Sequence, residues 1–273
     1  MISQQDKQFN ALPSARELQK YIRYYNLVFP EKNTFAAQYT LMPNACGTLS
    51  LAFDGLAIQA ELWGATTRPI ALGAEPNGYR ALLLIQLSPY GLYQLTRQEQ
   101  AALADQRLPL ADVDDQLCRQ LRQALITSRD TRELAHACDS IFHRRLEKRV
   151  VSDALQSAAA MIVERRGQVR VKEIARQVCY SQRQLNRLFQ AQIGMGVKQY
   201  ARLTRFSYVL ARLSKSPGLL AALSQQAGYF DQAHLDKDFK AISGVSPQEY
   251  IKTMADFYYD EAEIWRTISS EEE

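Results

Sequence analysis

The sequence has few of the residues from which enzymes build metal centres and nucleophilic sites. It contains only three histidines among 273 residues, and none of them lies in the segment 34–87, which has the texture of β-strands. His136 and His143 are seven residues apart on an expected helix, where a surface or core role is favoured over metal binding. There is also no glycine-rich phosphate loop and no Gly-x-Ser-x-Gly motif. We therefore expect no enzyme, no catalytic residue, no metal and no cofactor.

Cysteine pairs and long apolar runs are lacking too. The four cysteines, Cys46, Cys118, Cys138 and Cys179, form no Cys-x-x-Cys pair, so we expect them to be small buried hydrophobes of a reducing cytoplasm. No apolar run approaches eighteen residues, and residues 1–10 are too polar for a signal peptide. The expected location is the cytoplasm, without a membrane partner.

Charge is distributed unevenly along the chain. Residues 1–150 carry 17 basic and 15 acidic side chains, whereas residues 151–254 carry 15 basic and 7 acidic ones, a net charge of +8. Residues 255–273 carry one basic and seven acidic side chains. A basic segment of this kind favours a phosphate-bearing partner, although a solvated basic face would have the same composition.

The basic segment contains a near-repeat. Residues 171–194 and 219–244 each have a short apolar-periodic helix, a tight turn and a second helix, which is the pattern of a helix-turn-helix. The matching residues lie 50 positions apart: Leu185, Phe189, Gly194 and Tyr200 recur as Leu235, Phe239, Gly244 and Tyr250. Two such units on one chain can enter two adjacent major-groove segments of DNA.

Local start signals set the boundaries of these helices. Ser181 and Asp231 are good N-caps, which predicts recognition helices over 181–192 and 231–242. Gly228 lies in the second turn, where glycine adopts a left-handed backbone without steric cost. Residues 246–249, Ser-Pro-Gln-Glu, combine an N-cap serine, a proline and a glutamate, and predict one further short helix.

From about residue 152 to residue 254 the chain resembles the DNA-binding domain of the AraC/XylS family of transcription regulators. The most diagnostic residues are Gly-Tyr-Phe-Asp-Gln-Ala-His at 228–234, Asp-Phe-Lys at 238–240 and Gly-Val-Ser-Pro-Gln-Glu-Tyr at 244–250. The resemblance implies seven helices, with the two helix-turn-helix units joined by a long helix over 197–213.

The chain departs from the family pattern at a few positions. Cys179 stands where the family usually has the turn glycine, and a left-handed non-glycine residue costs about 1 kcal/mol. Lys237 replaces the usual arginine, and Asp236 and Asp238 flank it. Because a carboxylate near phosphate is unfavourable, the second unit is expected to bind DNA more weakly than the first.

Polar residues on the outward faces of the two recognition helices are the candidate DNA contacts. Arginine pairs bidentately with guanine, and asparagine or glutamine with adenine. The resemblance assigns base reading to Arg183, Asn186 and Arg187. Arg202 and Arg205 of the linking helix are expected to clamp phosphates or to be solvated. The full candidate set is Gln182, Arg183, Asn186, Arg187, Gln190, Gln232, His234 and Lys237.

The N-terminal part is expected to be an α+β domain preceding the all-α DNA-binding domain. A first helix is predicted over 14–25, short strands over 34–87 suggest a small barrel or sandwich, and amphipathic helices follow over 113–126 and 132–146. Asp54-Gly55 is typical of a two-residue hairpin turn. This order resembles the cupin-like barrel and dimerisation hairpin of the family. Leu12-Pro13 and residues 41–44 and 87–92 look more particularly like a sensor-type domain found in some of these regulators.

These observations divide the chain into a sensor or dimerisation domain (1–149), a DNA-binding domain (150–254) and an acidic tail (255–273). The expected function is that of a sequence-specific regulator of transcription that binds double-stranded DNA and responds to an unidentified small-molecule effector. The family resemblance implies RNA polymerase and a second copy of the chain as further partners. Two alternatives stay open: a helix-turn-helix protein acting only through protein partners, and a cupin-type enzyme.

Overall fold

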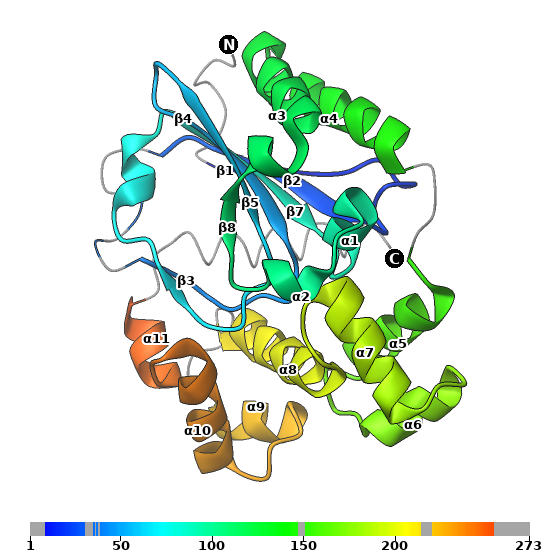
Figure 1. Cartoon of the computed structure of the whole chain (residues 1–273). Coiled ribbons are helices and arrows are strands. Elements are labelled where there is room, and N and C mark those ends of the chain that lie inside the picture. Colours follow the sequence, from blue (N-terminus) through cyan, green and yellow to red (C-terminus); the bar gives the residue numbers. More distant parts are fainter. Residues whose placement is uncertain are drawn as a thin grey trace.

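The N-terminal part is built on a six-stranded antiparallel sheet (Figure 1). The computed structural model describes residues 9–30, 35, 37, 39–146, 151–213 and 220–253. The sheet has the order β1-β2-β7-β4-β5-β8, and a short ribbon, β3-β6, lies apart from it. The strands are β1 (Phe9–Pro13), β2 (Ile22–Val28), β3 (Thr40–Leu41), β4 (Thr48–Phe53), β5 (Ile58–Trp63), β6 (Ile70–Ala71), β7 (Ala81–Leu87) and β8 (Arg107–Pro109).

The two faces of the sheet have different neighbours. Along β4 and β7, Leu49 pairs with Ile85 and Leu51 pairs with Leu83, and all four side chains are fully buried in the main core. Because side chains alternate across a strand, the intervening residues face the other way. Helices α3 (Leu110–Thr127) and α4 (Thr131–Leu146) pack together and contact strands of the sheet. They confirm the two amphipathic helices predicted from the sequence.

The first predicted helix, over 14–25, is wrong. Residues 16–21 make only hydrogen-bonded turns, and the chain then enters β2, which pairs with both β1 and β7. Every residue of β2 except Arg23 is buried. In a strand that is covered on both faces nearly every residue is buried, including residues three or four apart. The apolar residues of 14–25 therefore fit the spacing of a helix as well as that of a buried strand.

The hairpin at Asp54 is confirmed, but its loop is longer than predicted. Phe53 pairs with Ile58, so four residues form the turn. The Asp54 carboxylate accepts hydrogen bonds from the backbone N–H groups of Leu56 and Ala57, at 2.7 and 2.8 Å. The aspartate thus closes a wider turn by binding its own backbone, as Asx turns do. The strands β4, β5 and β7 of the segment predicted as a barrel or sandwich belong to a sheet whose two edges, β1 and β8, come from outside that segment.

Seven helices make up the C-terminal part of the described chain, as the resemblance implied. They are α5 (Asp153–Glu164), α6 (Val171–Gln177), α7 (Gln182–Ile193), α8 (Val197–Leu213), α9 (Leu220–Gln226), α10 (Gln232–Ser243) and α11 (Pro247–Thr253). The recognition helices α7 and α10 begin one residue after their predicted caps, and α8 has its predicted bounds. The acidic tail lies outside the described residues, as do residues 147–149 of the charged run 144–149. Among the described helices, none is long and apolar enough to cross a bilayer.

The two parts of the molecule share one continuous core. Three short helical segments follow the central strands, namely η1 (Glu75–Gly78), α1 (Gly91–Thr96) and α2 (Gln100–Leu103). Both α1 and α2 contact α7 (Figure 1). At Gly194, which ends α7 with a positive φ of 92°, an added Cβ would lie 2.8 Å from the Gln100 carbonyl oxygen. Glycine therefore lets the end of α7 pack closely against α2.

Candidate nucleic-acid interface

The start of α7 is fixed by a reciprocal pair of hydrogen bonds. The Ser181 hydroxyl accepts from the Gln184 N–H at 3.2 Å, and the Gln184 side-chain oxygen accepts from the Ser181 N–H at 3.0 Å. This capping box satisfies two N–H groups that the helix leaves unpaired. The sequence predicted the cap, and the pairing gives the helix a defined first turn.

The N-terminal half of α7 presents a polar face to solvent. Leu185 and Phe189 are fully buried, whereas Arg183, Arg187 and Gln190 are exposed. Gln182 is exposed too. These four predicted DNA contacts therefore lie on the side of the helix away from the core, within the width of a major groove.

Asn186 is placed differently from its predicted neighbours. It is half-buried, and its side-chain oxygen accepts a hydrogen bond from the Val197 N–H at 3.2 Å. It thus caps the first turn of α8. An added Cβ at Gly196 would lie 2.5 Å from the same oxygen. Asn186 therefore positions α8 against α7, a role that its expected place among the base-reading residues did not include.

The second recognition helix, α10, starts from an aspartate cap. The Asp231 carboxylate accepts from the His234 N–H at 2.7 Å. His234 and Lys237 are exposed, while Gln232 is half-buried. The His234 ring meets the Tyr229 ring edge-on at 5.2 Å between centroids, which restrains the imidazole beside the helix start.

Asp238 is turned toward the protein. Its carboxylate accepts from Arg202 Nε at 2.7 Å and from the Tyr229 hydroxyl at 2.9 Å. Burial of the phenol, together with this carboxylate, raises the pKa of Tyr229. Because Asp238 is already paired with a cation, it gives no reason to expect weaker DNA binding by α10. Arg202 forms an ion pair with Asp238 while its side chain stays 44% exposed, so it remains accessible to solvent.

Arg205 also points into the protein. Its Nη2 donates to the Gly167 carbonyl at 3.1 Å, and its guanidinium lies over the Tyr229 ring, 5.2 Å from the centroid. Gly167 lies in the loop that leads from α5 into the first helix-turn-helix unit, and Tyr229 belongs to the second unit. Arg205 therefore joins the two units, a role that differs from the phosphate clamp expected from the sequence.

Both helix-turn-helix units contain one turn residue with a left-handed backbone. Cys179 has a φ of 59° and Gly228 a φ of 72°. Cys179 is also exposed, unlike Cys46, Cys118 and Cys138, so the expectation of four buried cysteines is wrong for this one. The backbone, and not burial, determines the energetic cost at position 179.

Replacing Cys179 by glycine is expected to stabilise the protein by about 0.5–1 kcal/mol, because glycine removes the steric cost of the positive φ and no buried side chain is lost. Urea unfolding under reducing conditions would measure the change. The opposite replacement, Gly228→Ala, serves as the matched control and should be destabilising. Equal effects of the same sign in the two variants would contradict the explanation.

The second turn is one residue longer than the first, and its last residue is exposed. Phe230 is 89% exposed and immediately precedes the Asp231 cap. Aromatic and methyl groups can contact the thymine methyl in the major groove. The longer spacing from Gly228 to Asp231 than from Cys179 to Ser181 is visible in the sequence. The exposed Phe230 in this longer turn was nonetheless missed.

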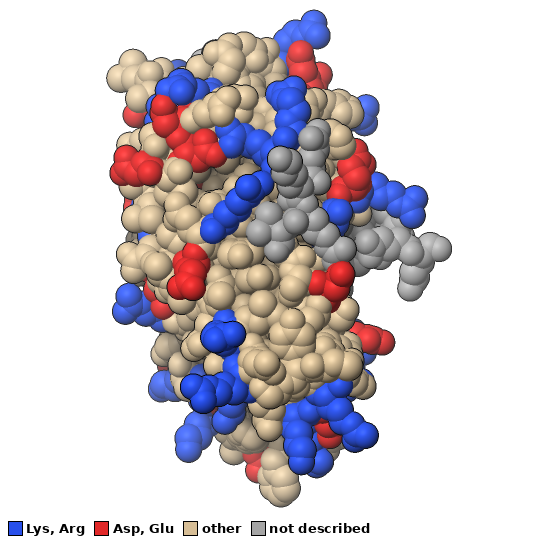
Figure 2. All heavy atoms as spheres, turned by 45° about the vertical axis from the view of Figure 1, so that its right-hand side comes forward, with Lys and Arg blue, Asp and Glu red and all other residues tan. Residues whose placement is uncertain are grey.

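Positive charge gathers on the part of the surface formed by these helices. Figure 2 shows lysine and arginine side chains prevailing over the lower part of the molecule, whereas basic and acidic residues are mixed over the upper part. Counter-ions released from DNA by such a surface give affinity that falls steeply with salt.

One acidic residue of the N-terminal part lies beside the α7 face. Glu99 lines the same open recess as Cys179, Gln184 and Arg187, and its side chain is exposed. A carboxylate at this place repels DNA phosphates and attracts the arginine that would approach them. The N-terminal part thereby reaches the edge of the candidate interface.

Glu99→Gln is expected to raise DNA affinity by about two- to threefold at low salt, with the gain shrinking as salt screens the charge. A fluorescence-anisotropy titration at several salt concentrations would measure this gain. Glu133→Gln, which removes the same charge from α4, is the control and should leave affinity unchanged. An equal gain of DNA affinity in both variants would mean that the affinity depends on the net charge of the protein and not on the position of the carboxylate.

Comparison with known proteins matches the C-terminal part of the chain. Residues 174–253 match a family model described as a helix-turn-helix domain. Over 80 residues the chain is 30% identical to the arabinose operon regulatory proteins of Salmonella typhimurium and Escherichia coli. The match covers 29% of this chain and 28% and 27% of those two proteins, so it spans under a third of the length of either.

Two solved structures match the chain at lower sequence identity. The C-terminal domain of AraT, a response regulator from Geobacillus stearothermophilus, has 22% identity and a TM-score of 0.36, and the match covers 39% of this chain and 89% of that one. ToxT from Vibrio cholerae has 12% identity and a TM-score of 0.45, with 90% of this chain and 98% of that one covered.

Proposed function

We propose that this chain, whose C-terminal part is a helix-turn-helix domain of the AraC/XylS family, is a sequence-specific regulator of transcription. Its two recognition helices would enter successive major-groove segments on one face of double-stranded DNA. The observation that carries the proposal is the pair of capped helices, α7 and α10, each with an exposed polar side next to a buried apolar one.

The residues proposed to contact DNA are those that the fold leaves exposed. On α7 they are Gln182, Arg183, Arg187 and Gln190, and on α10 His234 and Lys237, with the half-buried Gln232 beside them. Asn186 is left out because its side-chain oxygen already caps α8. Arginine contributes most to the reading of guanine, since its two parallel N–H donors match the O6 and N7 acceptors.

The N-terminal domain is proposed to control this DNA-binding domain, with the boundary near residue 150. It contacts α7 through α1 and α2, and it brings Glu99 next to Arg187. A signal received by the N-terminal domain can thus alter the orientation or accessibility of the first recognition helix. Any effector must bind two arrangements of the domains with different affinity.

Selection of fragments bound from a random DNA pool, followed by affinity measurements at several salt concentrations, tests the proposed function. We expect two conserved blocks about one helical turn apart and a linear fall of log affinity with log salt concentration. Motif-free binding with a similar salt slope would refute sequence reading, and the absence of any salt-sensitive affinity would refute DNA binding.

Arg187→Ala is expected to cost about 1–3 kcal/mol of binding free energy and to relax base preference at one position of the selected motif. Repeating the selection with the variant measures both effects. Arg212→Ala, which removes an exposed arginine from α8, should leave the motif intact. If Arg187→Ala lowers affinity equally for all sequences, the residue contacts phosphate and not a base.

A further inference from the structure

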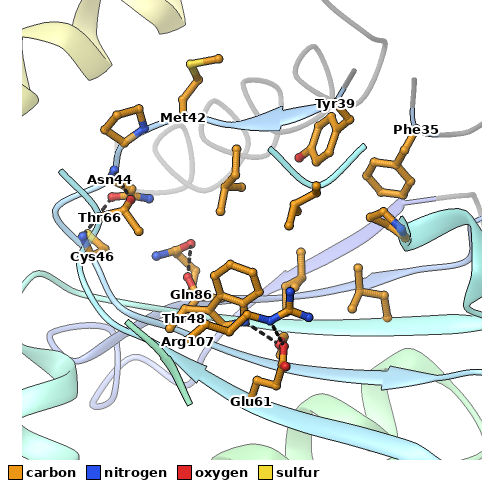
Figure 3. Close-up of a pocket in the computed structure, with 18 of the residues that line it drawn as sticks. Phe35, Tyr39, Met42, Asn44, Cys46, Thr48, Glu61, Thr66, Gln86 and Arg107 are labelled. Atoms are coloured by element: carbon orange, nitrogen blue, oxygen red, sulfur yellow. Dashed lines mark hydrogen bonds and ion pairs between the residues drawn. The ribbon is translucent and has the colours of Figure 1, made fainter. Parts of the chain in front are cut away.

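A cavity of about 230 Å³ lies between the sheet and two helices of the DNA-binding domain. Its floor is the face of the sheet opposite the main core, where Thr48 and Gln86 are joined by a hydrogen bond (Figure 3). Phe35 and Tyr39 lie across from this floor in the same view. Other lining residues come from α8 and α11, namely Ser207, Leu210, Ala211 and Tyr250.

The charged residues of the cavity form one compact group around Arg107. Its Nε lies 2.7 Å from Glu61 and its Nη2 lies 3.0 Å from Glu75. The guanidinium also covers one face of the Trp63 ring, 4.6 Å from the centroid. Among the described lining residues, two glutamates thus face a single arginine, which leaves the lining with one negative charge in excess.

This charge balance selects the kind of molecule that the cavity can accept. An anion would have to compete with two carboxylates for Arg107, and it would add a second uncompensated charge in a partly dry space. A cation instead meets Glu75, whose side chain is 46% exposed, and whose Oε1 also lies 3.3 Å from the Tyr79 hydroxyl. Aromatic rings attract cations through their electron-rich faces.

We propose that the cavity binds a small organic cation with a flat aromatic body. Its positive group would lie against Glu75 and Glu61, and its body between the aromatic side chains Tyr39, Trp63 and Tyr79. A few fixed polar groups in an otherwise apolar hollow are typical of a small-molecule site. Tyr39, Trp63 and Tyr79 all line the cavity.

The position of the cavity connects such a ligand to the second helix-turn-helix unit. Tyr250, which lines the cavity, packs edge-on against Phe239 of α10 at 5.7 Å between ring centroids. A ligand that contacts α8 and α11 would therefore alter the packing of α11 against α10. This coupling rests on the proposed DNA-binding function, whereas ligand binding itself does not.

Three probes with one indole body test the proposal on the full-length chain by isothermal titration calorimetry at pH 7. Tryptamine is a cation, tryptophol is neutral and indole-3-propionate is an anion. We expect tryptamine to bind at least about tenfold more tightly than indole-3-propionate, with tryptophol between them. Binding of indole-3-propionate as tight as that of tryptamine, or no binding of tryptamine at millimolar concentration, would overturn the proposal.

Glu75→Gln locates the site. The variant removes the excess negative charge, so tryptamine binding should weaken at least about fivefold, indole-3-propionate binding should strengthen, and tryptophol binding should stay within about twofold. Unchanged tryptophol binding also shows that the variant is folded. Glu164→Gln, at an exposed position of α5, is the matched control. A preference for tryptamine that survives in Glu75→Gln would place the binding elsewhere and overturn the assignment.

DNA affinity measured with and without saturating tryptamine tests the coupling separately. A change of affinity in either direction supports it, because coupling between two binding sites is reciprocal. Unchanged affinity, with tryptamine bound, overturns the coupling and leaves the ligand site. If the protein binds no DNA in the absence of ligand, the proposed function is refuted, whereas the calorimetric result on tryptamine binding still stands.

Discussion

Phe239→Ala is expected to lower the free energy of unfolding by about 3–5 kcal/mol. Phe239 is only 1% exposed, and its ring packs against Phe206 of α8 at 5.0 Å and against Tyr250 of α11 at 5.7 Å between centroids. The alanine variant would leave a cavity where three helices meet. Urea unfolding followed by circular dichroism would measure the loss.

The same variant should also lose specific DNA binding, because α10 loses the packing that holds it in place. Phe230→Ala, one residue before the α10 cap, is the control for stability alone, because its ring is exposed and its removal should change the free energy of unfolding by at most about 0.5 kcal/mol. Phe239→Leu should cost less than the alanine variant, since it refills most of the space. A loss below about 1 kcal/mol in Phe239→Ala would mean that the three helices repack freely.

The helices of the DNA-binding domain could be predicted because their start signals are local. Ser181 and Asp231 bond to N–H groups three residues away, and so does Ser246, whose hydroxyl accepts from the Glu249 N–H. Such contacts depend only on neighbours in the sequence, so residue type and spacing are enough to identify them. The left-handed turn at Cys179 was predictable for the same reason.

The roles of individual polar residues could not be predicted in this way. Asn186 bonds to a backbone group 11 residues away, and Asp238 to an arginine 36 residues away. On a helical wheel both are outward polar residues, which is also where DNA contacts lie. Only the packing of α8 against the recognition helices reveals which polar side chains are already engaged.

The N-terminal part illustrates the same limit for strands. The stripe formed by Leu18, Tyr21, Ile22 and Tyr25 fits helical spacing, yet β2 lies inside a sheet and is buried on both faces. The periodicity of apolar residues follows the pattern of burial. A strand that is buried on both faces shows no alternation of apolar and polar residues, so it cannot be recognised by that pattern. The cavity was beyond reach for a further reason, since its walls come from strands and from α8 and α11, more than a hundred residues apart.

Arg205→Ala is expected to cost about 2–3 kcal/mol of stability, because a charge-assisted hydrogen bond and a cation–π contact are lost together. The Nη2 bond reaches Gly167, whose backbone is pressed against α8: an added Cβ there would lie 2.1 Å from the Ala201 carbonyl oxygen. The ring contact reaches Tyr229 in the second unit. A further bond joins the same loop to the second unit, from Gln168 Nε2 to the Gln226 carbonyl at 2.9 Å.

The functional consequence concerns the spacing of the two DNA blocks. With Arg205 in place the two units are held in one relative orientation, so selection from a random pool should return a single spacing. In Arg205→Ala the blocks should persist while their spacing broadens, and Arg205→Lys should restore little, because an ammonium cannot both stack and donate in a plane. Arg212→Ala is the control on the same helix, since the contact of Arg212 within the described chain is with Tyr208 of α8 itself, 5.5 Å from the ring centroid. A single sharp spacing in Arg205→Ala would show that α8 alone sets the geometry.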